Sequence, residues 1–217
     1  MKNNGNGRRG EEEEGPSSDS ASPLPGSTEK DASEAEDIAW MLRAKDDDLG
    51  AFSELVKKHQ KSVMNFFARN GVYRDVEDLA QETFLKLHRA RQGYRPTAKF
   101  TTFLYLIARQ VMIDSIRHGG RKAKVLEGYG QEAEQAEDAP TMRGESEDAE
   151  AALGSLSPPL REAVVLVVMQ GMAYGEAAEI LGVPVGTVKS RISAAMEKMR
   201  EAIRDKRHSP RGHKTSP

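Results

Sequence analysis

The stretch YGEAAEILGVPVGTVKSRISAAMEKMR, residues 174–200, decides the fold of the C-terminal part of this 217-residue chain. A first short helix is predicted by small or apolar residues at helical spacing, namely Ala177, Ala178 and Leu181. Gly182 ends this helix, because glycine adopts the left-handed conformation of a helix C-terminus without a Cβ clash. Pro184 follows with a fixed φ that suits the first turn of a new helix.

The second helix of this stretch has one apolar and one basic side. Val188 and Ile192 lie four residues apart and face the first helix, and the outward set is Thr187, Lys189, Ser190 and Arg191. Two helices, a glycine turn and a basic second helix are typical of a helix-turn-helix, whose second helix enters the DNA major groove. An amphipathic hairpin with a solvated basic face is the alternative that this stretch alone leaves open.

The composition excludes several classes of protein. The absence of cysteine excludes disulfides, thiol nucleophiles and Cys-ligated zinc, and it is typical of a reducing cytosol. The N-terminus has no apolar signal-peptide core, and the longest apolar run, residues 163–169, is too short to span a bilayer. With 37% apolar and 30% charged residues, part of the chain is expected to stay unpacked. We therefore expect a soluble, cytoplasmic protein that does not insert into a membrane.

Charge is unevenly distributed along the chain, although the net charge is −2. Residues 1–37 carry a net charge of −6, residues 38–124 of +8, residues 125–150 of −8 and residues 151–217 of +4. Two basic segments separated by an acidic one favour nucleic acid as the partner of the basic segments. The alternation also suggests that the acidic linker or the N-terminal tail covers a basic DNA-facing surface in the free protein.

Periodicity predicts an all-α fold with two small helical domains. Residues 1–36 are rich in Gly, Ser, Pro and Glu and are predicted to form a disordered acidic tail. The first domain covers residues 37–124, an acidic flexible linker residues 125–152, the second domain residues 153–204 and a basic disordered tail residues 205–217.

Four helices are predicted in the first domain. The first has a short apolar stripe, Ile38, Met41 and Leu42, which the aspartates at 46–48 end. The second and clearest has His59 at the edge of an apolar face at helical offsets, formed by Phe52, Leu55, Val56, Val63, Phe66 and Phe67. A helix over residues 75–91 follows, with an outer side formed by Asp78, Gln81, Glu82, Leu85 and Arg89, and then a loop over residues 93–99. The last helix starts near Thr101 or Thr102, either of which suits an N-cap, and the glycine pair at 119–120 ends the domain.

Aromatic and basic residues interleave at the start of this last helix: Tyr94, Arg95, Lys99, Phe100, Phe103, Tyr105 and Arg109. Aromatic faces beside cations suit single-stranded nucleic acid, because unpaired bases stack and the backbone is charged. The alternative is that these aromatic side chains belong to the core, and the sequence leaves both open.

No Walker-type phosphate loop, HExxH motif or nucleophile elbow is present, and His59 has no second ligand at useful spacing. We expect no enzymatic activity, no metal and no cofactor.

Two separate stretches resemble the extracytoplasmic-function sigma factors, the compact class of bacterial RNA polymerase sigma subunits. The first is DVEDLAQETF at residues 75–84, followed by Tyr94, Phe100, FL at 103–104, IAR at 107–109 and Asp114. The second runs from Leu156 and Pro159 through REA at 161–163, Gly171, Tyr174 and Leu181-Gly182 to GTVKSR at 186–191. The resemblance covers residues 38–124 and 153–204, with a short acidic linker between them.

The resemblance implies a role for each domain. The first domain resembles the family's region 2 and would bind the polymerase clamp helices through Asp78, Gln81, Glu82 and Phe84. It would bind the unpaired −10 strand through Tyr94, Arg95, Lys99, Phe100, Thr102, Phe103, Tyr105 and Arg109. The second domain resembles region 4 and would bind the −35 duplex through Val185, Thr187, Lys189, Ser190 and Arg191. The implied partners are core RNA polymerase, promoter DNA and an anti-sigma factor.

The chain departs from the family's usual residues at Phe103, Gln110, Ala173, Ser193 and Ala194. Phe103 offers a smaller stacking surface than the usual tryptophan. Ala173 lacks the hydroxyl of the usual serine, an N-cap worth about 1 kcal/mol. Ser193 and Ala194 leave the second helix poorer in charge. The alternative function is a polymerase-independent helix-turn-helix regulator, which needs neither the polymerase-facing polar residues nor the aromatic cluster.

Overall fold

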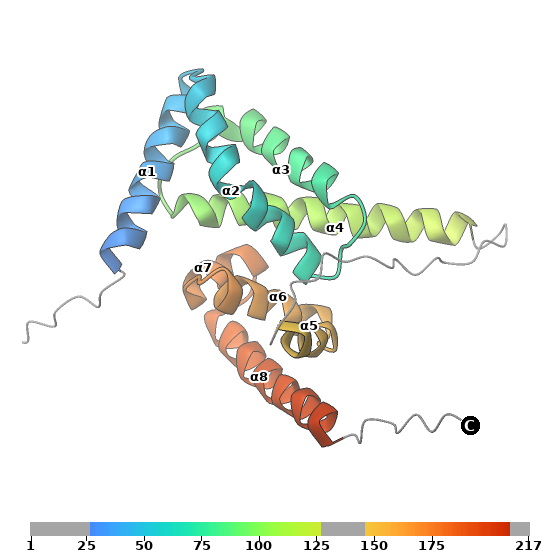
Figure 1. The fold of residues 1–217 in the computed structure, drawn as a ribbon. Helices are drawn as coiled ribbons and strands as arrows, with labels where there is room; N and C mark the ends of the chain where they lie inside the picture. Colours follow the sequence, from blue (N-terminus) through green and yellow to red (C-terminus); the bar gives the residue numbers. More distant parts are fainter. Residues whose placement is uncertain (1–26, 127–145, 209–217) are drawn as a thin grey trace, which may run out of the picture.

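The computed structural model describes residues 27–126 and 146–208, and these residues form two helical domains that pack against each other (Figure 1). The N-terminal domain consists of α1 (Ser27–Lys45), α2 (Leu49–Arg69), α3 (Val76–Ala90), a short 3₁₀ turn η1 (Arg91–Gly93) and α4 (Phe100–Leu126). The C-terminal domain consists of α5 (Ser146–Gly154), α6 (Pro158–Val164), a π-helical turn η3 (Val165–Met169), α7 (Tyr174–Leu181) and α8 (Val185–His208). The predicted all-α fold is confirmed for the described residues.

The predicted apolar face of α2 lies in the core of the N-terminal domain. Leu55, Val63, Phe66 and Phe67 are all 0–1% exposed. They pack against the buried side chains of α3 and α4, which include Leu79, Leu87, Phe100, Leu104 and Val111. His59, expected at the edge of this face, is buried at 8% exposure. The α2 prediction succeeds because almost every apolar side chain of this helix lies on one side.

The first helix begins earlier than the sequence analysis expected. α1 starts at Ser27, so residues 27–36 are helical rather than part of a disordered tail, and residues 1–26 lie outside the described residues. These ten residues show no apolar stripe. Polar contacts with other helices hold them instead: Lys58 Nζ donates to the Ser33 carbonyl oxygen at 3.0 Å, and Glu34 accepts from the backbone of Phe100. Such partners are distant in sequence, so periodicity does not reveal them.

The start of α4 agrees with the predicted loop over residues 93–99, but the predicted N-cap and C-terminal end were wrong. The helix starts at Phe100, so neither Thr101 nor Thr102 is its N-cap, and Thr102 is buried at 1% exposure. A carboxylate from α1, Glu34, accepts from the Phe100 backbone instead. At the other end α4 continues through the glycines at 119–120 to Leu126. Each glycine costs a helix only about 1 kcal/mol relative to alanine, and the following residues RKAKVL include good helix formers.

The C-terminal domain also begins and ends outside its predicted bounds. α5 starts at Ser146, inside the segment expected to be a flexible linker, and Ala152 and Leu153 are buried at 2% and 3% exposure. The predicted linker is thus helical from residue 146, and residues 127–145 lie outside the described residues. α8 extends to His208, past the predicted domain end at residue 204, and residues 209–217 lie outside the described residues.

The helix-turn-helix is formed as predicted by α7 and α8. Gly182 ends α7 in the left-handed conformation with φ 66° and ψ 38°. Val188 is 0% exposed and Ile192 packs against the core, so the apolar side of α8 faces the rest of the domain. Ala173 occupies the N-cap position of α7, where its methyl group cannot accept a hydrogen bond. The Glu176 side chain accepts from the Ala173 backbone N–H at 2.8 Å, which satisfies that donor.

Candidate polymerase and nucleic-acid interfaces

The outer face of α3 presents the residues predicted to bind polymerase. Asp78, Gln81 and Glu82 are exposed, and Glu82 pairs with Lys86 one turn later at 3.1 Å. Phe84 is 7% exposed and faces inward from the same helix. Acidic side chains in the first turn of α3 interact favourably with the helix dipole, which helps this polar helix to form.

An apolar groove between α2 and α3 lies beside these polar residues. It has a volume of about 550 Å³, and its walls and rim are formed by Phe52, Val56, Gln60, Met64, Glu77, Ala80, Gln81, Phe84, Leu85 and His88. Leu85 is 56% exposed, which is unusual for a leucine next to a core helix. The sequence analysis placed Leu85 on the outer side of its helix but did not name it as a site residue. It missed the groove because Phe52, Val56 and Phe84 have the spacing of core residues.

Four of the predicted −10 residues are buried in this structure. Tyr94, Phe100, Thr102 and Tyr105 are at most 3% exposed. The rings pack on one another and on α2: the ring centres of Tyr94 and Phe100 are 6.5 Å apart, and those of Phe66 and Tyr105 are 5.3 Å apart. The alternative that these aromatic side chains belong to the core therefore holds here. Their burial positions the start of α4, and they offer no stacking surface to a base in this arrangement.

The pKa values of the two tyrosines follow from their burial. Desolvation raises the pKa of Tyr94 to about 12, and the nearby carboxylates of Glu34 and Asp37 act in the same direction. Desolvation likewise raises the pKa of Tyr105 to about 12. Both hydroxyls therefore stay protonated to higher pH than a free tyrosine. Tyr105 Oη donates to Gln170 Oε1 at 2.6 Å, whereas Tyr94 Oη is buried without a hydrogen-bond partner among the described residues.

The remaining predicted −10 residues are at least partly accessible. Arg95 and Lys99 are exposed, and Phe103 and Arg109 are half-buried. Phe103 lies against Tyr94 with ring centres 5.3 Å apart. Lys99 and Arg109 face the C-terminal domain, where Lys99 Nζ lies 2.9 Å from Glu176 Oε1 and Arg109 Nη2 donates to Glu162 Oε2 at 3.3 Å. Both cations thus extend from the N-terminal domain toward carboxylates of the C-terminal domain.

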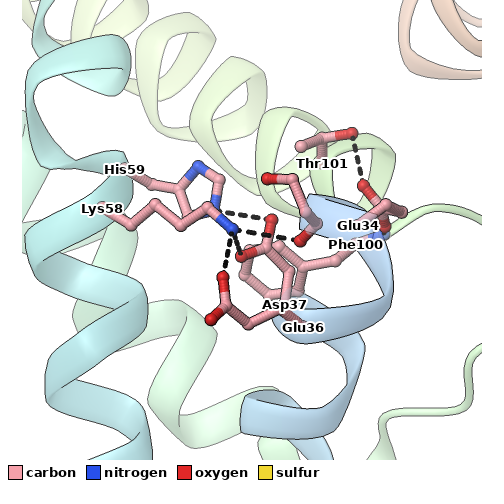
Figure 2. A network of polar contacts seen from close by, with 8 residues as sticks. Glu34, Glu36, Asp37, Lys58, His59, Phe100 and Thr101 are labelled. Atoms are coloured by element: carbon pink, nitrogen blue, oxygen red, sulfur yellow. Dashed lines mark hydrogen bonds and ion pairs between the residues drawn. The ribbon is translucent and has the colours of Figure 1, made fainter. Parts of the chain in front are cut away.

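A buried polar network ties α1 to α2 and α4 (Figure 2). Asp37 is 2% exposed; its Oδ1 lies 2.6 Å from Lys58 Nζ and its Oδ2 lies 3.0 Å from His59 Nε2. Glu34, one turn earlier, lies at the N-terminus of α4 and accepts from Phe100 N and from Thr101 Oγ1, the latter at 3.5 Å. Partial burial raises the pKa of Glu34 against these hydrogen bonds. This network orients the start of α4.

The five predicted −35 residues lie on the first two turns of α8. Val185 is 41% exposed, and Lys189 and Ser190 are exposed. Thr187 and Arg191 are half-buried. Ser190 Oγ donates to the Thr187 carbonyl oxygen at 3.0 Å, so its lone pairs face outward. The structure thus presents a basic, hydroxyl-bearing helix start of the kind that fits a major groove.

Three positions at which the chain departs from the family's usual residues lie at or near the surface. Gln110 Nε2 donates to Asp114 Oδ1 at 2.9 Å, Ser193 is exposed and Ala194 is half-buried.

Among the described residues no group of three or more metal-ligating side chains comes together. In the same part of the chain, no helix combines the length and apolarity needed to cross a bilayer.

Comparison with known protein families defines the class of protein. Residues 55–122 match the Sigma-70 region 2 family, and residues 146–199 match the Sigma-70 region 4 family. The first match covers most of α2, α3 and α4, and the second covers α5 to most of α8. The chain thus has the two helical domains of a sigma-70-type transcription initiation factor.

Comparison with individual relatives identifies the family within this class. The chain is 33% identical over 182 residues to the ECF RNA polymerase sigma-E factor of Escherichia coli K12, covering 78% of this chain and 93% of that protein. It is 32% identical over 174 residues to CarQ of Myxococcus xanthus, covering 75% and 95%. To ECF sigma factor SigE of Mycolicibacterium smegmatis it is 35% identical over 159 residues, covering 70% of this chain and 62% of the relative.

The chain belongs to the extracytoplasmic-function family of RNA polymerase sigma factors. It directs RNA polymerase to promoters as an initiation factor and is not an enzyme. Solved structures agree with this assignment: RpoE of Bartonella quintana, in complex with the anti-sigma factor NepR, has a TM-score of 0.61 at 26% identity, covering 70% of this chain and 96% of that one. CnrH in complex with the cytosolic domain of CnrY has a TM-score of 0.60 at 25% identity, covering 78% and 98%.

Proposed function

We propose that the groove between α2 and α3, together with Asp78, Gln81 and Glu82, binds core RNA polymerase. The observation that carries this assignment is Leu85, which is 56% exposed at the edge of the groove. Exposed apolar grooves with a polar rim are typical of surfaces that receive an amphipathic helix. The apolar side chains supply the binding energy, and the polar rim fixes the orientation of the partner.

We further propose that α8 binds the −35 duplex. Lys189 and Ser190 are exposed on its first turns, and Val185 adds an apolar contact suited to a thymine methyl group. Lys189 and Arg191 carry the positive charge that phosphates require. Ser193 is exposed but uncharged, so Lys189 and Arg191 are the only cations among residues 185–194 of α8.

The −10 role falls to the accessible residues near the start of α4. Arg95 and Lys99 supply positive charge, Phe103 supplies a partly exposed ring, and Arg109 lies two turns further along the helix. An unpaired strand requires this combination of cations and a stacking surface. The buried residues Tyr94, Phe100, Thr102 and Tyr105 would support these side chains from beneath or become accessible after rearrangement.

The polymerase assignment is tested with Leu85→Asn in the full chain, and Leu49→Asn serves as the matched control. Leu49 is 67% exposed at the start of α2 and does not line the groove. We expect Leu85→Asn to weaken binding to core polymerase by about tenfold or more, equivalent to about 1.4 kcal/mol. Run-off transcription at subsaturating protein should fall in parallel.

Equal polymerase affinity of the Leu85 and Leu49 variants would contradict the groove assignment. A library of promoter-length duplexes in the same run-off assay would identify both promoter elements. Duplex binding without any polymerase-dependent start site would favour the alternative of a polymerase-independent regulator.

We also propose that an anti-sigma factor holds this chain inactive in the cytoplasm, where polymerase resides. The support is that RpoE of Bartonella quintana was solved with the anti-sigma factor NepR. A candidate regulator should compete with core polymerase for the purified chain. A regulator that binds the chain together with polymerase, without competition, would contradict this proposal.

A further inference from the structure

The connection between η1 and α4 carries two cations of the proposed −10 surface and runs beside α1 (Figure 1). Residues 95–99 of this connection are all exposed, and they include Arg95 and Lys99. The flanking residues Tyr94 and Phe100 are only 3% and 0% exposed. We call residues 95–99 the −10 loop. Its two ends are buried, and each is bound by a side chain of α1.

The start of the −10 loop is held by the last turn of α1. Lys45 Nζ donates to the Tyr94 carbonyl oxygen at 3.2 Å, and Gln92 Nε2 donates to the Lys45 carbonyl oxygen at 3.0 Å. Arg91, which begins η1, lies 2.5 Å from Asp47 in the turn that follows α1. These contacts fix the backbone before the loop relative to the C-terminal end of α1.

The end of the −10 loop is held by an earlier turn of α1. Glu34 accepts from the Phe100 backbone N–H and from Thr101 Oγ1, the latter at 3.5 Å (Figure 2). Phe100 is the first residue of α4, and the first N–H groups of a helix have no partner within it. Glu34 therefore accepts the hydrogen bond that an N-cap side chain usually accepts, and its carboxylate also interacts favourably with the helix dipole.

Both anchors of the −10 loop lie on one rigid element. Glu34 and Lys45 are roughly three turns apart on α1, which corresponds to a rise of about 16 Å along the helix axis. A short loop with both ends fixed to the same helix has fewer conformations than a loop fixed at one end only. A partner that requires one conformation of the loop therefore loses less conformational entropy when it binds.

The anchors lie in a different part of the sequence from the loop that they hold. The match to the Sigma-70 region 2 family covers residues 55–122, which include the −10 loop. Glu34, Lys45 and Asp47 precede these residues. Chains with the same loop sequence can thus differ in how the loop is held.

We propose that α1 determines how strictly the protein selects its −10 sequence, with Glu34 and Lys45 as positioning residues that hold the two ends of the −10 loop. Arg95, Lys99 and Phe103 contact the DNA, and the two anchors act through them. A loop held at both ends presents these side chains in one arrangement and accepts few bases, whereas a loop released at either end adapts to several. This inference rests on the proposed −10 role of the loop and of the start of α4.

The test is run-off transcription by core polymerase with the full chain. The template is a duplex library that keeps the −35 element selected by the wild type, randomises the −10 element and carries a barcode for each −10 sequence in the transcribed part. Sequencing of the transcripts gives the base ratio, which is the yield with the most preferred base over the yield with the least preferred base at each −10 position. A general loss of folded protein lowers every transcript alike and leaves this ratio unchanged, so the ratio distinguishes positioning from stability.

The anchor variant combines Glu34→Ala with Lys45→Met, which removes one contact at each end of the loop. The matched control combines Glu36→Ala with Arg43→Met, which makes the same change in charge on the same helix. Glu36 pairs with Lys58 and Arg43 pairs with Asp48, and neither pair includes a residue of the loop. The rescue variant combines Glu34→Gln with Lys45→Arg and keeps an acceptor and a donor at the two anchors.

We expect the anchor variant to lower the base ratio about threefold to tenfold, the range for the loss of one or two hydrogen bonds. The control and the rescue variant should keep the wild-type ratio. An unchanged ratio in the anchor variant would overturn the inference, and so would a rescue variant that selects bases as weakly as the anchor variant.

A separate variant distinguishes failure of this inference from failure of the proposed −10 role. Arg95→Ala with Lys99→Ala removes the cations of the loop and leaves both anchors in place. If this variant transcribes the library with the wild-type yield and base ratio, the proposed −10 surface itself is wrong. A lower yield from this variant, together with an unchanged ratio in the anchor variant, would retain the −10 surface and reject only the positioning role of α1.

Discussion

Removal of the Asp37 side chain should destabilise the N-terminal domain more than any exposed charge change. Asp37 is 2% exposed, and its two oxygens lie 2.6 Å from Lys58 Nζ and 3.0 Å from His59 Nε2 (Figure 2). Asp37→Ala leaves both partners without this carboxylate and removes the main polar contact between α1 and α2. The substitution therefore tests whether α1 is held by buried polar contacts.

The magnitude follows from the degree of burial. Breaking a fully buried ion pair costs about 3–5 kcal/mol, because the remaining charge stays desolvated. Lys58 is 27% exposed and retains Glu36 at 3.2 Å, which reduces this cost. We therefore expect the free energy of unfolding to fall by about 2–3 kcal/mol. For a domain of this size, that corresponds to a melting temperature lower by about 10 °C or more.

The assay combines urea unfolding with hydrogen exchange measured by mass spectrometry. Urea gives the free energy of unfolding, and hydrogen exchange shows whether the amides of α1 (Ser27–Lys45) open before the core of α2. Glu54→Ala is the matched control, since Glu54 pairs with Lys57 at 2.7 Å while both side chains are largely exposed. Its expected effect is about 0–1 kcal/mol.

An equal loss of stability in Asp37→Ala and Glu54→Ala, with α1 exchanging at the wild-type rate in both, would contradict this prediction. That result would mean that α1 is held by its apolar side chains, such as Met41, which is 0% exposed.

Three further predictions concern single residues. Burial raises the pKa of Tyr105 to about 12 in the folded protein, against 10.0 for a free tyrosine, so the unfolded chain loses this proton first and the stability contributed by Tyr105 falls between about pH 10 and 12. Tyr105→Phe should therefore lose about 2–3 kcal/mol less unfolding free energy than the wild type over this pH window. Parallel curves of unfolding free energy against pH for the two proteins would contradict this prediction. Gly182→Ala should cost roughly 1–2 kcal/mol in urea unfolding, from backbone strain at φ 66° alone, because no atom lies within 4 Å of the added Cβ; unchanged stability would disprove the strain. Ala173→Ser should raise the free energy of unfolding by up to about 1 kcal/mol by capping α7. A less stable variant would show that the contact of Glu176 with the Ala173 backbone already fulfils the capping role.

The sequence predicted those elements whose structure depends on neighbouring residues. The α2 stripe and the Gly182 turn are local patterns, so periodicity and backbone preference were enough. The start of α1 and the start of α4 depend on each other instead: Glu34 accepts from Phe100, a residue 66 positions later. Neither helix start contains a pattern that specifies this contact, so the start of α1 and the N-cap of α4 were predicted wrongly.

The candidate −10 site was predicted only in part, because its exposure also depends on contacts between residues far apart in the sequence. Aromatic residues near the start of α4 have the same spacing whether they face a core or a nucleotide. α4 packs on α2 and α3 within its domain and also contacts α7 of the other domain, which buries Tyr105. Helical spacing alone places Phe84 and Leu85 on different sides of α3, as observed, but the groove beside them depends on how α2 packs against α3, which the sequence does not specify.

Net charge by segment also concealed how the C-terminal domain is organised. Residues 151–217 carry a net charge of +4, which correctly favours a nucleic-acid partner. The side of this domain that faces α4 nevertheless carries three oxygen acceptors that contact α4 or the residue before it, namely Glu162, Gln170 and Glu176. Lys189, on the first turns of α8, is exposed and unengaged by these contacts. One small domain thus carries acceptors on the side that faces α4 and cations on the exposed first turns of α8. A net charge summed over the whole segment cannot reveal this two-sided distribution, because it depends on which helix faces the other domain.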